Sequence, residues 1–397
     1  MPAGGALARV LVLLGSHSNP PRVQLIALNV RIPESVRVSD SKVHEPGCGP
    51  DHRHGIGGLP TGSYPDRAIL PDMTQPQPVL DPLSPAALFL VLSVRPGSEA
   101  AVRDVLADVS GLVRSVGFRS AHGELSCVVG VGSAIWDRLF GSPRPAKLHP
   151  FRPLRGPRHH APATPGDLLL HIRAGRYDLC YELGVLILDR LAGLVVVEDE
   201  TMGFRYFEQR DLLGFVDGTE NPTGIGAARA VLIGDEDPDF AGGSYLIVQK
   251  YLHDMSAWTA LSTEDQERVI GRTKLADVEL PDDVQPSNSH VALNTIVDAD
   301  GTEHQIVRSN MPFGSPSRGE SGTYFVGYAA DPGVTELMLR RMFLGDPPGN
   351  YDRILDFSTA VTGSLFYIPT VDFLDDPPEP TGGLPDGSLA IGDMRGE

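Results

Sequence analysis

One pattern occurs twice in the chain: an apolar stretch, a Pro-Gly turn, and then a run with apolar residues at helical spacing. It reads ALFLVLSVRPGSEAAVRDVLADV at residues 87–109 and TYFVGYAADPGVTELMLRRMFLG at residues 323–345. The apolar stretches are rich in β-branched and aromatic residues, which favours buried strands. Apolar residues three and four apart favour amphipathic helices. Two similar strand–turn–helix units predict a chain built from two related α+β halves.

Other strands and helices complete the pattern in the first half. The strands are predicted at residues 87–94, 125–132, 166–174 and 193–200, and the helices at 98–116, 133–141 and 176–191. Strand, helix, strand, strand, helix, strand is the order of a ferredoxin-like unit. The second half adds a strand at 243–254 and a helix at 262–273, and Ser98 and Ser262 are placed to cap their helices. The predicted fold is α+β, with two ferredoxin-like domains and antiparallel sheets of the dimeric α+β barrel type.

Composition divides the chain further. Residues 1–73 are rich in Pro, Gly, Ser and His, and we expect a disordered leader or a start codon placed too early. The two domains are then predicted at 74–205 and 206–374. Residues 375–397 read as a Pro/Gly-rich flexible linker followed by a tail.

Charge and cysteine content exclude several classes of protein. The net charge is −18, whereas a protein that binds nucleic acid normally has a basic surface. No apolar run reaches the roughly 20 residues that span a bilayer, so no membrane partner is expected. Cys48, Cys127 and Cys180 are scattered and form no CxxC, which predicts reduced thiols in a cytoplasmic protein. Cys48 could join His52 and His54 as metal ligands, but a second ligand cluster is missing from the sequence.

The stretch GFVDGTENP at residues 214–222 places Asp217 and Glu220 in a glycine-bounded turn. A calcium loop is disfavoured, because the series of alternate oxygen ligands that an EF-hand needs is missing. A surface turn and an acid–base aspartate beside a cofactor both stay open. Two apolar residues lead into the turn, which favours a partly buried aspartate.

A second candidate site lies further along the chain. His290 follows the polar loop QPSNS, and we expect it where a strand begins, so that its side chain projects into a cleft. The chain then turns at DADG and returns as TEHQIVRSNMPF. A strand period of two places Ile306, Arg308 and Asn310 on one face. That face is either part of a polar site or an edge exposed to solvent.

Taken together, these stretches resemble the dye-decolourising peroxidases. GFVDGTENP resembles the GxxDG motif of that family, and SNSHVALN, IVRSNMPFG and YDRILDFSTAVTGSLFYIPT follow in the family's order and with the spacing of its B-type members. The resemblance extends over residues 76–375. It implies one haem b per chain, bound in the C-terminal domain.

The resemblance also implies roles for individual residues. His290 matches the axial ligand of the haem iron, and Asp352 matches the carboxylate that accepts a hydrogen bond from it, with Asp356 as the alternative. Asp217 matches the acid–base group that moves a proton between the peroxide oxygens. Arg308 matches the cation that stabilises charge on the departing oxygen, and Asn310 is its neighbour. The cofactor-binding set that the family implies is His290, Arg308, Asp217, Gly218, Thr219 and Glu220.

The tail resembles the C-terminal targeting peptide of encapsulin cargo proteins. Its core is Ser388, Leu389, Ala390, Ile391 and Gly392, within DGSLAIGDMRG. The family pattern continues with Ser-Leu-Lys, whereas this chain has Asp-Met-Arg. The resemblance implies an encapsulin shell protein as partner and a place inside a nanocompartment in the cytoplasm.

The resulting hypothesis is a haem peroxidase that reduces hydrogen peroxide and oxidises bulky organic donors such as dyes or phenolics. The alternatives are a haem-handling, deferrochelatase-like protein and an inert passenger of the shell. We also expect a homo-oligomer. Trp136 and Trp258 are interpreted as packing residues or electron relays, and Glu220 and Glu279 are candidates for binding manganese.

Overall fold

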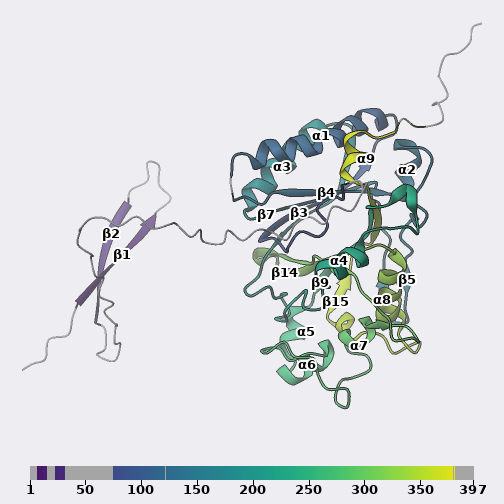
Figure 1. Ribbon diagram of the computed structural model, residues 1–397. Helices are drawn as coiled ribbons and strands as arrows, with labels where there is room; N and C mark the ends of the chain where they lie inside the picture. The colour runs from purple at the N-terminus through teal and green to yellow at the C-terminus, as the bar shows by residue number, and fades with distance from the viewer. Residues whose placement is uncertain (1–6, 16–22, 32–74, 121, 379, 381–397) are drawn as a thin grey trace, which may run out of the picture. The chain divides into compact units, whose positions relative to one another are not determined.

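The computed structural model describes residues 7–15, 23–31, 75–120, 122–378 and 380 (Figure 1). Strands β1 (Leu7–Gly15) and β2 (Val23–Arg31) pair antiparallel and form a unit by themselves. The interpretation of residues 1–73 as a leader stays a prediction. Two groups of residues singled out from the sequence lie outside the described ranges, namely Cys48, His52 and His54 near the N-terminus and Ser388, Leu389, Ile391 and Gly392 in the tail.

The first half of the second unit has the predicted strand and helix order. Its main elements are β3 (Ala86–Val94), α1 (Glu99–Gly117), β4 (Ser126–Gly132), α2 (Ser133–Leu139), β7 (Leu168–Ala174), α3 (Tyr177–Arg190) and β8 (Val195–Phe204). A short pair, β5 (Leu154–Arg155) with β6 (His160–Ala161), lies between α2 and β7. The antiparallel strands run in the spatial order β4-β7-β3-β8, the arrangement of a ferredoxin-like sheet.

The second half repeats that arrangement with longer insertions. Its sheet has the order β12-β14-β9-β16, with β13 paired to β14 and β15 paired to β9. The strands are β9 (Ser244–His253), β10 (Ile296–Val297), β11 (Glu303–His304), β12 (Val307–Arg308), β13 (Met311–Ser315), β14 (Glu320–Ala329), β15 (Ser358–Ala360) and β16 (Ser364–Ile368). The helices are α4 (Gly224–Val231), α5 (Met255–Thr259), α6 (Thr263–Ile270), α7 (His290–Asn294), α8 (Pro332–Leu344) and α9 (Val371–Asp375), with 3-10 turns η1 (Pro238–Phe240), η2 (Pro316–Arg318) and η3 (Arg353–Asp356). The predicted fold of two ferredoxin-like α+β units is confirmed.

The two halves share one sheet and one interior. Strand β16 pairs with β4 through Phe366↔Gly132 and Tyr367↔Val131, which joins the strands into a ten-stranded antiparallel sheet within residues 75–378. Inward-facing side chains of the halves meet, and the rings of Phe89 and Tyr324 stack with their centroids 4.1 Å apart. Burial of this inner face holds the halves in a fixed relation, and so fixes where the second half presents its loops.

Helices α1 and α3 cover the outer face of the first half (Figure 1). The buried side of α1 carries Val102, Leu106, Val109, Leu112 and Val116, at the three- and four-residue spacing that its sequence predicts. Strands β3 and β7 are buried on both faces, which explains why β3 is almost entirely apolar, whereas β7 also buries His171 and Arg173. Among the described residues, no helix has both the length and the apolarity to cross a membrane.

Several details differ from the sequence prediction. Ser98 precedes α1, but its side chain makes no capping hydrogen bond. Ser262 caps α6 as predicted, since its hydroxyl accepts from the Asp265 N–H at 3.1 Å. Helix α6 ends at Ile270 rather than at residue 273, because Gly271 adopts a left-handed conformation with φ of +98°. The prediction that His290 begins a strand is wrong: it is the first residue of the short helix α7.

Candidate active site

A cavity in the second half gathers the predicted site residues. It contains about 1120 Å³ of empty space, part of it open to solvent. Its wall comes from loop 211–220, strand β9, helix α7, residues 306–310 and helix α8. Most of the wall is apolar, with a few polar side chains among the apolar ones, as is usual for a cofactor or ligand site. The predicted site residues that line it are Asp217, Gly218, Thr219, Glu220, His290, Arg308 and Asn310.

His290 stands at the start of α7, where the preceding residue caps the helix. The Ser289 hydroxyl accepts from the Ala292 N–H at 3.3 Å, and Ser289 is fully buried. A short helix begins here instead of the predicted strand, and the Ser289 hydroxyl satisfies one of the N–H groups of its first turn. The histidine is thereby attached to a rigid element at the wall of the cavity.

A buried carboxylate holds the His290 ring. Nδ1 of His290 lies 2.7 Å from Oδ2 of Asp352, whose side chain is fully buried. Asp352 is itself fixed, because its Oδ1 accepts from the Ile354 N–H at 3.0 Å and its own N–H donates to the Met342 carbonyl at 2.9 Å. A carboxylate at Nδ1 selects the tautomer with the proton on Nδ1, so that Nε2 keeps its lone pair for a metal.

Asp356, the alternative partner, belongs to a different cluster. Its Oδ1 lies 3.1 Å from Nε2 of His159 and accepts from the Tyr351 hydroxyl at 3.0 Å. Its Oδ2 lies 3.3 Å from Nε of Arg353. Of the two aspartates, Asp352 is the one that contacts His290.

Asp217 lies partly buried at the tip of its turn. The Asp217 N–H donates to the Gln209 carbonyl at 2.9 Å, and Nδ2 of Asn310 donates to Oδ1 of Asp217 at 3.2 Å. Asn310 is oriented in turn, because its Oδ1 accepts from the Val326 N–H at 3.0 Å. Gly218 has a φ of +83°, a conformation that disfavours a side chain, so the glycine after Asp217 is required by the turn.

Arg308 supplies positive charge to the same cavity. Burial lowers the pKa of its guanidinium, and the neighbouring carboxylates of Asp217 and Glu220 oppose that shift. An arginine stays protonated over the range in which enzymes work. Ile306 and Asn310 line the cavity with it, so these three residues share one face, as the strand period predicts.

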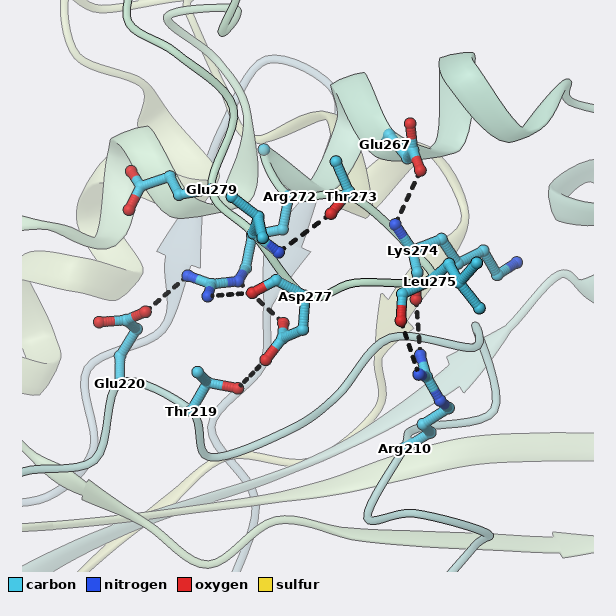
Figure 2. A network of polar contacts seen from close by, with 12 residues as sticks. Arg210, Thr219, Glu220, Glu267, Arg272, Thr273, Lys274, Leu275, Asp277 and Glu279 are labelled. Atoms are coloured by element: carbon cyan, nitrogen blue, oxygen red, sulfur yellow. Dashed lines mark hydrogen bonds and ion pairs between the residues drawn. The ribbon is translucent and has the colours of Figure 1, made fainter.

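The sequence did not reveal the network that holds the loop of Thr219 and Glu220 (Figure 2). Nη1 of Arg272 lies 2.5 Å from Oε1 of Glu220, and Nε of Arg272 lies 3.0 Å from Oδ1 of Asp277. The Thr219 hydroxyl donates to Oδ2 of Asp277 at 2.7 Å. Arg272 also lines the cavity. Its part in the site depends on contacts between distant segments, and nothing in its sequence neighbourhood marks it.

His253 and Asp211 also line the cavity, and the sequence did not mark either of them, because their surroundings come from distant segments. His253 is held at both ring nitrogens, with Nδ1 2.8 Å from the Ser358 hydroxyl and Nε2 2.9 Å from the Thr323 hydroxyl. Burial lowers the pKa of His253 to about 4, so it is neutral near pH 7. Burial raises the pKa of the Asp211 carboxyl to about 7. The hydrogen bond that this carboxyl accepts from the Phe215 N–H acts in the opposite direction and lowers the pKa.

The remaining candidates lie elsewhere or in an adjoining pocket. Trp136 and Trp258 are buried among aromatic rings, which agrees with the interpretation as packing residues. Glu220 and Glu279 line a second pocket that adjoins the cavity. Within the described ranges, no three His, Cys, Asp or Glu side chains converge closely enough to hold a metal ion, and manganese binding stays a prediction.

Cys127 and Cys180 are buried free thiols, and burial raises the pKa of each to about 12.

Comparison with known proteins shows which family the chain resembles. The profile described as Dyp-type peroxidase, N-terminal, matches residues 76–205, and the profile described as Dyp-type peroxidase, C-terminal, matches residues 208–373. A dye-decolorizing peroxidase from Mycolicibacterium paratuberculosis is 63% identical over 337 residues, which are 83% of this chain and 95% of the relative.

Solved structures give the same result. The encapsulated DyP-type peroxidase from Mycobacterium smegmatis is similar with a TM-score of 0.76 and 63% identity, over 77% of this chain and 99% of the other. A DypB variant from Rhodococcus jostii in complex with heme is similar with a TM-score of 0.75 and 65% identity, over 76% of this chain and 98% of the other.

Proposed function

The chain belongs to the Dyp-type peroxidase family, and we propose that it is a haem-dependent peroxidase that reduces hydrogen peroxide and oxidises bulky organic donors such as dyes or phenolics. One observation carries the proposal. His290, oriented by a buried carboxylate at 2.7 Å, lines the same cavity as Asp217 and Arg308. A metal-binding imidazole, a carboxylate and a cation around one apolar cavity suit the reduction of a peroxide at a bound iron.

The residues of the cavity fit haem b. The apolar wall suits a flat porphyrin, and Nε2 of His290 is available for the iron because Nδ1 is committed to Asp352. The bound haem supplies the redox-active iron at which peroxide is reduced and from which donors are oxidised. Asp352 increases the electron density of the imidazole by accepting its N–H.

The other polar residues act on the peroxide. Asp217, as a carboxylate, accepts the proton of one peroxide oxygen and returns it to the departing one. Arg308 stabilises the negative charge that develops on the departing oxygen. Asn310 keeps Oδ1 of Asp217 oriented through its 3.2 Å hydrogen bond, so that the other oxygen stays free for the proton.

We also propose that the chain is cargo of an encapsulin shell, as the relative from Mycobacterium smegmatis is encapsulated. The support within this chain is the Ser-Leu-Ala-Ile-Gly core at 388–392, after the Pro/Gly-rich stretch 377–383. An extended segment with apolar residues at alternate positions can fill pockets on a partner. A homo-oligomer would present several tails to one shell and add avidity.

The test is peroxide-dependent oxidation of a dye by the purified, haem-loaded protein. The proposal requires turnover that depends on both peroxide and haem. It also requires Asp217→Ala and Arg308→Leu to bind haem and to oxidise the dye more slowly. Release of intact porphyrin without dye oxidation would reject the peroxidase in favour of a haem-handling protein.

A further inference from the structure

Strand β12, which carries Arg308, forms the edge of the sheet. Among the described strands it pairs with β14 alone, through Val307↔Tyr328 and Arg308↔Gly327. Alternate residues of a strand direct their backbone groups to opposite sides. The N–H and C=O of Arg308 therefore point away from β14, to the side on which no strand of the described residues pairs with β12.

The side chain of Asn221 makes the hydrogen bonds that a neighbouring strand would make with Arg308. Its Oδ1 accepts from the Arg308 N–H at 2.9 Å, and its Nδ2 donates to the Arg308 carbonyl at 2.7 Å. A primary amide presents a donor and an acceptor side by side without needing to be protonated, so asparagine matches both groups of one residue. An aspartate here would face the Arg308 carbonyl with a second acceptor.

The same asparagine is fixed to the turn that carries Asp217. The Asn221 N–H donates to the Gly218 carbonyl at 3.1 Å. A Cβ built at Gly218 would lie 3.4 Å from Nδ2 of Asn221, so the amide packs beside the turn of Asp217. Asn221 thus connects the turn of Asp217 to the backbone of Arg308, although the two segments are far apart in the sequence.

We propose that Asn221 is a positioning residue, which sets the backbone of Arg308 relative to Asp217 so that the guanidinium and the carboxylate act on one peroxide. The inference rests on the proposed peroxidase function. Asn221 is not one of the described residues that line the cavity. It therefore acts through Arg308 rather than on the substrate. A shift of about 1 Å in a catalytic group can cost up to a hundredfold in rate.

Gln77 provides a matched control in the first half. Its Oε1 accepts from the Val129 N–H at 2.8 Å, and its Nε2 donates to the Val129 carbonyl at 2.9 Å. It makes the same two-point contact with one backbone residue, and it donates to the Pro369 carbonyl as well. Gln77→Ala therefore removes the same two-point contact together with one further hydrogen bond, and Gln77 does not line the cavity.

The experiment measures fluoride affinity and the rate of reaction with peroxide in the haem-loaded protein. Fluoride would bind the iron of the haem-loaded protein and could accept a hydrogen bond from the Arg308 guanidinium, which lines the cavity, so its affinity would report the position of Arg308. Asn221→Ala should lower both quantities about tenfold or more, while Gln77→Ala stays within about twofold of wild type. In an Arg308→Leu background, Asn221→Ala should change the peroxide rate by no more than about twofold, because residues that act as a unit are not additive.

Unchanged fluoride affinity and rate in Asn221→Ala would overturn the proposal, and so would a full tenfold loss on top of Arg308→Leu. If Asn221→Ala does not fold, Asn221→Thr keeps one contact at most and should show a smaller loss in the same two measurements. A wild-type protein that takes up haem but does not react with peroxide would instead refute the proposed function.

Discussion

Replacing Asp352 with Asn should weaken haem binding while leaving the fold intact. Asn keeps the size of the side chain and an oxygen that can accept from the Ile354 N–H, as Oδ1 of Asp352 does at 3.0 Å. At the 2.7 Å contact with His290, however, an NH₂ group replaces a carboxylate oxygen. This NH₂ group either repels the Nδ1–H of His290 or favours the tautomer that has its proton on Nε2. In that tautomer Nε2 has no lone pair for the iron.

The magnitude follows from the lost contact. A hydrogen bond to a charged group contributes roughly 1.5–3 kcal/mol, and about 1.4 kcal/mol is a factor of ten in affinity. Asp352 is fully buried, so solvent does not compensate for the loss. We therefore expect haem affinity to fall between about tenfold and a hundredfold, the usual cost of removing the partner of a metal-binding histidine.

The assay is titration of the haem-free protein with haem, followed by absorbance, beside a thermal melt. Asp356→Asn is the control, since that carboxylate pairs with His159 and Arg353 and does not contact His290. Affinity of Asp352→Asn within about twofold of wild type would refute the reasoning, and so would an equal loss in Asp356→Asn.

Three other predictions concern the cavity and the tail. Arg308→Leu should slow the reaction with peroxide more than Asp217→Ala does, if stabilisation of charge outweighs proton transfer; stopped-flow rates in the reverse order would contradict this. Because burial holds the pKa of His253 at about 4, below the roughly 6.5 of an unfolded histidine, the unfolded state binds more protons between these values. Stability should therefore fall as pH drops from about 6.5 to about 4, and chemical unfolding of His253→Gln should show a weaker dependence on pH in that window. Removal of residues 384–397, or the change Leu389→Asp, should abolish co-elution with a co-expressed encapsulin shell and leave dye oxidation unchanged; a truncated enzyme that still co-elutes would refute the targeting role.

Much of the fold could be predicted because its cause is local. The apolar run of β3 and the spacing of buried residues in α1 follow from hydrophobic periodicity, and the cap of α6 follows from Ser262. The same local logic failed at His290, where we expected a strand. Ser289 can begin a helix as well as end a loop, and its hydrogen bond to the Ala292 N–H decides for the helix.

Some residues of the candidate site could be predicted from the sequence, and others could not. The motifs located His290, Asp217 and Arg308, because those residues belong to stretches that resemble a family. Arg272 lies outside those stretches, and Asn221 lies within GFVDGTENP without a role implied for it. Neither role could be predicted, because each depends on a contact with a distant residue: Arg272 with Glu220, 52 residues away, and Asn221 with the Arg308 backbone, 87 residues away. Asp352 and Asp356 are four residues apart; the resemblance favours Asp352 with Asp356 as the alternative, and in the structure Asp352 is the one that contacts His290.

The absorption spectrum of the haem-loaded protein, beside those of His290→Ala and His253→Ala, tests the central claim most directly. Both histidines line the cavity, but His253 has both ring nitrogens held by hydroxyl groups, whereas Nε2 of His290 is left for the iron. The account predicts that wild type and His253→Ala share the spectrum of a histidine-ligated haem and its change on addition of peroxide, and that His290→Ala loses most of its haem. Undiminished haem with an unchanged spectrum in His290→Ala would contradict it.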